Sequence, residues 1–200
     1  YQNSGRGRHG RVWTAPKGSQ VTLSILIRPT AESIERLGTM PLVSGLAIID
    51  ALTATAARHP DATDKLTPQL KWPNDVLIDG RKLCGILAEA VSLGPEPAVV
   101  IGLGLNVSIT TEELPVPHAT SLDLEAPGIE IDRAQLTADV LLALHHRINQ
   151  WVDADPQLMA DYRAVCSSIG ADVKVLLPGD EELLGTVRDV ADDGRLVVVD

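Results

Sequence analysis

The sequence predicts an α+β protein, with helices mainly on one side of a mixed β-sheet and a small β module at the C-terminal end. Three observations support this fold class. Apolar and polar residues alternate between Val21 and Ile27, which is the period of a half-buried strand. The mostly apolar stretch from Met40 to Arg58 is long enough for a buried helix. Short apolar runs separated by Gly-containing turns fill the segment 169–200, a pattern typical of small β domains.

Composition limits the classes of protein to consider. The chain has 200 residues, of which 44% are hydrophobic, and this suits one domain with a small appendage. Its formal net charge is −10, so nucleic acid is not expected as a main partner, because such proteins usually carry a broad basic face. No unbroken apolar run reaches the roughly 18 residues of a membrane span, and no membrane partner is expected. Cys84 and Cys166 fit no metal or disulfide spacing, which indicates buried thiols in a reducing, cytoplasmic compartment.

Four further strands are expected in the middle of the chain. They are Gln69–Trp72, Val76–Ile78, Arg81–Glu89 and Ala98–Val107. Asp79-Gly80 lies between the second and third of these strands and is the sequence of a two-residue type I′ hairpin. We therefore expect an antiparallel hairpin at this point.

Helices are expected to follow. The segment 115–128 is rich in proline and is predicted to be a loop. Asp132 is suited to cap a helix that reaches Val152, with an apolar stripe along one side. A second helix is expected over about 156–168, stopping at Gly170.

The C-terminal β module is expected to form a separate unit. Its predicted strands are 172–177, 182–189 and 195–199, joined by turns at Pro178-Gly179-Asp180 and Asp192-Asp193-Gly194. The module resembles part of an SH3-like barrel, which three strands leave unclosed. The expected domain organisation is therefore 1–168 for the main domain and 169–200 for the small one.

The segment Gly5–Arg11 combines three arginines and three glycines in an acidic chain. Arginine presents a rigid, permanently charged fork that fits phosphate bidentately. Glycine allows the backbone to come close to a ligand. The segment therefore predicts a binding site for a small molecule that contains phosphate. Disordered RNA-binding tails are also rich in Arg and Gly, but they repeat the pattern, and here it occurs once.

A second segment, Lys71-Trp72-Pro73-Asn74-Asp75, is predicted to form a fixed corner, because Pro73 cannot donate a hydrogen bond to a sheet. The hairpin that follows would bring Lys82 back beside Asn74 and Asp75. A carboxylate, an amide and an ammonium group together suit phosphate and Mg²⁺ more than proton transfer. A simple hairpin turn with an exposed lysine remains the alternative.

Three motifs, spread over about half of the chain, carry a resemblance to a known family. They are residues 2–13, the KWPND segment 71–75 with Lys82, and Gly102–Asn106. In this order they resemble the signatures of bacterial biotin protein ligases. The resemblance implies a class II synthetase-like catalytic domain and an SH3-like C-terminal domain. It also implies a Ser/Thr-Thr-Asn segment before Tyr1, so the catalytic domain would lack its N-terminal part and the C-terminal domain would be incomplete.

The resemblance implies an ATP-dependent ligase. Biotin would be activated as biotinyl-5′-AMP and then transferred to a lysine of the biotin carboxyl carrier domain of an acyl-CoA carboxylase, with Mg²⁺ accompanying ATP. A homodimer is left open. A lipoate or octanoyl ligase of the same fold is one alternative. A non-catalytic sensor of biotin or nucleotide is another, although Arg8, Asp75 and Lys82 would be superfluous in a sensor.

The resemblance also implies a role for individual residues. Lys82 and Arg8 would be catalytic, and Asp75 would hold the metal. The residues expected to contact biotin are Gln2, Gly5, Arg6, Arg8, Lys82, Gly85 and Gly102. The residues expected to contact ATP or the adenylate are Arg8, Arg11, Trp13, Asn74, Asp75, Lys82 and Asn106.

Overall fold

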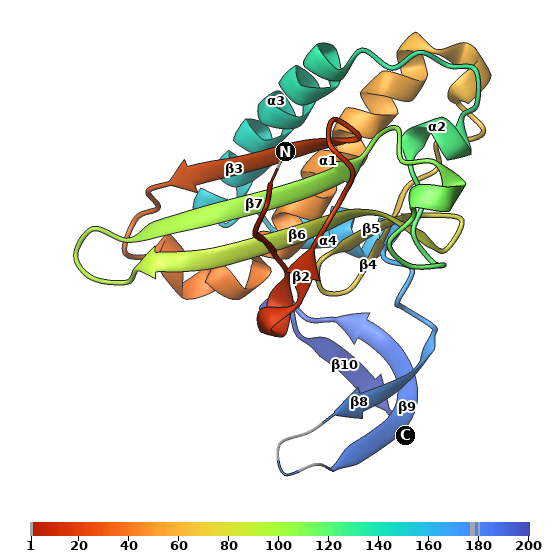
Figure 1. Ribbon diagram of the computed structural model, residues 1–200. Coiled ribbons are helices and arrows are strands. Elements are labelled where there is room, and N and C mark those ends of the chain that lie inside the picture. Colours follow the sequence, from red (N-terminus) through yellow and green to blue (C-terminus); the bar gives the residue numbers. More distant parts are fainter. Residues whose placement is uncertain (1, 177–178, 180) are drawn as a thin grey trace.

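A computed structural model of the chain describes residues 2–176, 179 and 181–200, and it confirms the α+β fold class (Figure 1). The main sheet has five strands in the order β3-β7-β6-β5-β4, and all pairs of neighbouring strands are antiparallel. Parallel pairing occurs at two isolated bridges, Leu70 with Cys166 and Lys82 with Ala119. The strands are β3 (Gln20–Ile27), β4 (Gln69–Lys71), β5 (Asp75–Ile78), β6 (Arg81–Ser92) and β7 (Ala98–Asn106).

Helices cover one face of this sheet. They are α1 (Met40–Arg58), α3 (Arg133–Val152) and α4 (Gln157–Val165), and α1 packs against both α3 and the sheet (Figure 1). By length and composition, the continuous helical stretch Ser33–Arg58 could span a membrane, although polar residues interrupt its apolar sequence. However, 72% of its most apolar window is buried inside the fold. It is therefore the central helix of the core.

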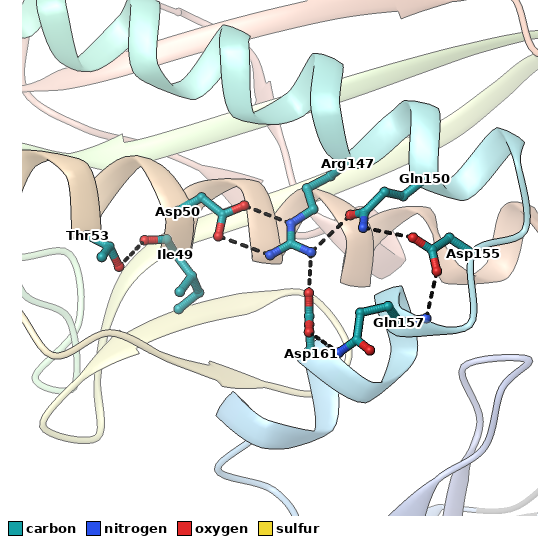
Figure 2. A network of polar contacts seen from close by, with 8 residues as sticks. All are labelled: Ile49, Asp50, Thr53, Arg147, Gln150, Asp155, Gln157 and Asp161. Carbon is teal, nitrogen blue, oxygen red and sulfur yellow. Dashed lines mark hydrogen bonds and ion pairs between the residues drawn. The ribbon is translucent and has the colours of Figure 1, made fainter.

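A polar network fixes the three helices to one another (Figure 2). The guanidinium group of Arg147 on α3 donates to both carboxylate oxygens of Asp50 on α1, over 2.7 and 3.1 Å. It also donates to Asp161 on α4 over 2.5 Å, and to Gln150 one turn along α3 over 3.0 Å. Bidentate contact with a carboxylate suits the planar fork of arginine. One side chain thus sets the spacing of three helices behind the sheet.

Most of the expected boundaries are confirmed. The Asp79-Gly80 turn has positive φ at both residues, 48° and 73°, as a type I′ hairpin requires. Asp132 caps α3 by accepting hydrogen bonds from the amides of Ala134 and Gln135. Three expectations need correction. β6 continues three residues beyond Glu89, α4 ends at Val165, and the loop expected at 115–128 contains the short helix α2 (Leu122–Glu125).

A second sheet ends the chain, in the order β10-β9-β8, and it forms no closed barrel among the described residues. Its strands are β8 (Asp172–Leu176), β9 (Glu182–Val190) and β10 (Leu196–Val199). Leu177, Pro178 and Asp180, which belong to the predicted first strand and turn, lie outside the described residues. The indole nitrogen of Trp72 donates to the carbonyl oxygen of Gly194 over 2.8 Å, and the guanidinium of Arg163 donates to Val190 over 2.7 Å. The small sheet is therefore bonded directly to the corner before β5 and to α4.

Candidate active site

A cavity of about 480 Å³ lies between the N-terminal segment and the strands β3, β6 and β7. The N-terminal segment crosses in front of the sheet, on the side away from α1 and α3 (Figure 1). The sequence-predicted residues that line the cavity are Gln2, Arg6, Arg8, Arg11, Trp13, Asn74, Asp75, Lys82, Gly85, Gly102 and Asn106. The fold therefore brings three separate sequence motifs to one place.

Gly5 is the one predicted site residue that does not line the cavity. It is buried in the short ladder of β1 (Gly5–Arg6) with β2 (Val12–Trp13), where it pairs with Trp13. A Cβ atom at position 5 would lie 2.3 Å from the carbonyl oxygen of Trp13, so only glycine fits there. The structure thus places Gly5 behind the wall of the cavity, and its contact with biotin stays a prediction.

Two glycines leave the space that the Trp13 ring occupies. A Cβ atom at Gly85 would lie 2.8 Å from the indole, and one at Gly104 would lie 2.5 Å from its nitrogen. Gly104 thus makes room for a side chain of the protein itself. Nothing closer than 3.6 Å would meet a Cβ atom at Gly102, which faces the cavity. The indole is therefore held flat against the sheet at one end of the site.

The arginine-glycine segment folds as a tight turn. The amide of Gly7 donates to the carbonyl oxygen of Arg11 over 2.7 Å, and His9 and Gly10 have positive φ angles of 56° and 72°. The side chains of Arg6, Arg8 and Arg11 all border the cavity. Within the described part of the chain, none of these three guanidinium groups has a hydrogen bond or an ion pair with a protein group. Three uncompensated cations on one cavity make it a site for an anion.

Lys82 lies opposite this turn, where the hairpin was expected to bring it. Its Nζ atom is 2.6 Å from Oδ1 of Asp75 and 5.3 Å from the centre of the Trp13 ring. The backbone of Lys82 is bonded on both sides, since its amide donates to His118 and its carbonyl oxygen accepts from Thr120. Oδ1 of Asp75 is buried, and the ammonium group of Lys82 compensates its charge. The ammonium group is thus fixed at the cavity, with one carboxylate beside it.

Asn106 ends a chain of side-chain hydrogen bonds. The indole nitrogen of Trp13 donates to Oε1 of Gln20 over 3.1 Å, and Nε2 of Gln20 donates to Oδ1 of Asn106 over 2.5 Å. Nδ2 of Asn106 then donates to the carbonyl oxygen of Thr120 over 2.8 Å. Sequence reasoning missed Gln20. A single glutamine at the start of a strand gives no signal of such a role.

The surroundings of Asp75 provide few ligands for a metal ion. The described residues contain no group of three or more His, Cys, Asp or Glu side chains that could hold an ion. Mg²⁺ is often held by one or two carboxylates together with phosphate oxygens. Asp75 offers a single carboxylate, whose Oδ1 is paired with Nζ of Lys82 at 2.6 Å, so the site suits an ion that arrives with phosphate groups and does not form a resident cage.

Cys84 lies on β6 behind the cavity, next to Gly85. Burial raises the pKa of its thiol to about 12, with a smaller opposing effect from Lys82. A thiol with such a pKa is almost entirely protonated near neutral pH and is a poor nucleophile. Cys84 is therefore part of the core and not of the chemistry.

Residues 1–106 match the sequence family described as the biotin/lipoate A/B protein ligase family. The match contains all three motifs that meet at the cavity. The chain belongs to this family. The biotin–[acetyl-CoA-carboxylase] ligase of Mycobacterium tuberculosis is 44% identical over 196 residues, which are 98% of this chain and 70% of that protein.

Other members of the family extend the comparison. The bifunctional ligase/repressor BirA of Escherichia coli is 30% identical over 99% of this chain, and the match spans 59% of that longer protein. Among solved structures, the biotin protein ligase of Aquifex aeolicus in complex with biotin and ATP has a TM-score of 0.77 and 25% identity. That match covers 98% of this chain and 78% of the other. The family fold therefore includes both the main sheet and the small C-terminal sheet.

Proposed function

We propose that this protein activates biotin with ATP as biotinyl-5′-AMP and transfers the biotinyl group to a lysine of a biotin carboxyl carrier protein. The observation that carries the proposal is the convergence of Arg6, Arg8, Arg11 and Lys82 on one cavity with an indole in its wall. Such a site offers positive charge for phosphate and a flat surface for a base. The named activities of the relatives from M. tuberculosis and E. coli support the same function.

The proposed reaction has two balanced steps. In the first, a carboxylate oxygen of biotin attacks the α-phosphorus of ATP, and the bond from that phosphorus to the bridging oxygen breaks, releasing pyrophosphate. In the second, a neutral lysine amine of the carrier attacks the carbonyl carbon, the bond from that carbon to the phosphate oxygen breaks, AMP leaves, and the nitrogen loses a proton to give the amide. Both reactants of the first step are anions, so cations that are already in place are the main catalytic need. Lys82 and Arg8 would hold the carboxylate and the α-phosphate together.

The cavity wall suggests how the substrate is oriented. Trp13 and Asn106 border one end and suit the adenine, since an indole ring can stack on a purine. Gly102 and Leu87 border the floor of β6 and β7, where the flat, apolar surface suits the fused rings of biotin. Gln2, Gly5, Arg6 and Gly85 would complete the biotin site, and Arg11 and Asn74 the nucleotide site.

Asp75 would hold a Mg²⁺ ion that arrives with the phosphates, and this ion would neutralise charge on the leaving pyrophosphate. The carrier partner is proposed from the activity of the relatives, as is a location in the cytoplasm, where ATP and carrier are both available. A homodimer is kept as part of the proposal, because four of the relatives are named as repressors as well as ligases.

A lipoate or octanoyl ligase is the alternative within the family, and a sensor without catalysis is the alternative outside it. The 44% identity to a biotin ligase favours biotin. Binding of biotin and of lipoate, measured by calorimetry, distinguishes a biotin ligase from a lipoate or octanoyl ligase. A sensor would bind biotin but release no pyrophosphate.

Mass spectrometry of the products formed from biotin, ATP and Mg²⁺ tests the proposed reaction. We expect biotinyl-5′-AMP from the wild type. We expect Lys82→Ala to form it at least about a hundredfold more slowly, because the lost ammonium group contacts charge that develops in the transition state. Lys71→Ala is the matched control, since Lys71 is exposed and does not line the cavity. No adenylate from the wild type, or an undiminished rate in Lys82→Ala, would contradict the proposal.

A further inference from the structure

The chain of hydrogen bonds through Gln20 has a direction that both of its ends determine. A backbone carbonyl can only accept, so the group that Asn106 presents to Thr120 must be its NH₂. An indole nitrogen can only donate, so the group that Gln20 presents to Trp13 must be its oxygen. The remaining link, from Nε2 of Gln20 to Oδ1 of Asn106, satisfies both conditions at once. The orientation of both amides is therefore fixed by chemistry, and not chosen between two equal alternatives.

This fixed orientation has a consequence for the cavity. Asn106 is 2% exposed and forms part of the cavity wall. After its bonds to Gln20 and Thr120, Oδ1 retains one lone pair and Nδ2 retains one hydrogen. An oxygen and an NH group on neighbouring atoms match the amino group and ring nitrogen of adenine. Guanine presents an oxygen in place of that amino group, and this oxygen would face Oδ1.

We infer that Gln20 is a positioning residue, which holds the Asn106 amide so that the site accepts adenine and disfavours guanine. The inference rests on the proposed nucleotide site and names the residue that sets its choice of base. Gln20 acts through Asn106 and through the Trp13 ring, which it holds by the indole nitrogen. It thereby joins β2 and β7 at the nucleotide end of the cavity.

The variant Gln20→Glu separates positioning from packing because it keeps the shape of the side chain. When it is ionised, Glu can accept from Trp13 but cannot donate to Oδ1 of Asn106. When it is protonated, its O–H group can donate, and the original pattern returns. A carboxyl group facing another acceptor has its pKa raised above the ordinary value of about 4.3. The variant should therefore be defective at pH 7.5 and recover toward pH 5.

Calorimetric binding of AMP and GMP measures the choice of base without any catalytic step. We expect the wild type to bind AMP at least about tenfold more tightly than GMP, within the discrimination available to one bidentate contact. In Gln20→Glu at pH 7.5 this ratio should fall to about two or less, and it should return on acidification. Each variant is compared with wild type at the same pH, so that effects of pH shared by the two proteins cancel.

Two controls complete the experiment. Gln69→Glu makes the same change at an exposed position outside the cavity and should bind like wild type at every pH. Gln20→Met removes both hydrogen bonds of Gln20 and leaves the bond from Asn106 to Thr120, so its ratio should lie between those of wild type and ionised Gln20→Glu and should not change with pH. The inference is overturned if wild type does not distinguish AMP from GMP, or if Gln20→Glu weakens both equally without recovery. Adenylate formation by the wild type is scored separately, so failure of the proposed reaction and failure of this inference give different results.

Discussion

At the scale of single residues, two sets of arginines in this chain have different surroundings. Arg36, Arg147 and Arg163 direct their donors at backbone carbonyls or carboxylates of the protein. Arg6, Arg8 and Arg11 direct theirs at the cavity. Leaving a guanidinium group without a partner contributes nothing to stability, so the second group is best explained by a ligand that brings its own negative charge.

Arg8 provides a test of this division. Biotinyl-5′-AMP is a reactive mixed anhydride, and a guanidinium contact to its phosphate would slow its escape. We expect Arg8→Gly to release the intermediate about ten- to a hundredfold faster, since one hydrogen bond to a charged group contributes ~1.5–3 kcal/mol. Lysines of a bystander protein should then become biotinylated, which a blot for biotin detects. Arg28→Gly, an exposed change outside the cavity, is the control. If the variant forms adenylate but labels the bystander no more than wild type, Arg8 does not retain the intermediate.

At the scale of elements, the contact of α3 with α1 and α4 depends on one polar side chain. The Arg147 side chain is 11% exposed, whereas its partners Asp50 and Asp161 are 36% and 30% exposed. Hydrogen bonds from Gln157 and then from Arg147 lower the pKa of Asp161. A carboxyl group with a lowered folded-state pKa adds stability above its unfolded pKa and loses it as the pH falls through the folded value.

We expect Arg147→Met to lower the free energy of unfolding by about 1–3 kcal/mol at pH 7, because Asp50 loses its donor and Asp161 keeps only Gln157. The difference in unfolding free energy between variant and wild type should begin to narrow below about pH 4, where an aspartate of the unfolded chain takes up a proton. It should be smallest below the lowered folded-state pKa of Asp161. Urea unfolding at several pH values measures both effects. Lys174→Met breaks an ion pair in which both side chains are about half exposed, and it should cost less than about 1 kcal/mol. A gap that stays constant down to pH 3 would exclude the role given to Asp161.

The elements predicted well from the sequence are those whose limits are set by residues within the element itself. Helix α1 begins and ends where expected, because its apolar run and Pro41 mark it without help from the rest of the fold. The 3₁₀ segment Ser33–Thr39 and helix α2 were not predicted. Leu122 in α2 is fully buried against the core, so that short helix depends on tertiary packing. The extension of β6 has a similar origin, since its last residues are held by pairing with β7, as in the pair Ser92 and Ala98.

At the scale of the whole molecule, the residues of the site could be predicted from the sequence better than the contacts that hold them in place. Arg8, Asp75 and Lys82 stand in motifs that can be read from the chain, and the fold brings them to one cavity. The seat of Trp13 on Gly85 and Gly104 and its bond to Gln20 join residues far apart in the sequence. Such contacts depend on strand order, which local patterns do not contain.

Cys84 reports on the integrity of the whole main sheet. It is fully buried on β6, between Val76 of β5 and Leu105 of β7, and burial raises its pKa to about 12. We expect iodoacetamide at pH 8 to modify Cys84 at least about a thousandfold more slowly in the native protein than in urea, since reaction requires opening of the sheet. Mass spectrometry of Cys166→Ser, which retains only this thiol, follows the reaction. Equal rates in both conditions would show that the centre of the sheet opens freely.

The seat of the Trp13 ring also limits how this sequence can diverge. A side chain at Gly85 or Gly104 would overlap the indole. A smaller side chain at position 13 would leave an unfilled space above the two glycines. No single replacement at these three positions keeps the packing. During evolution they must therefore change together or stay as they are, although 19 and 72 residues separate them along the chain.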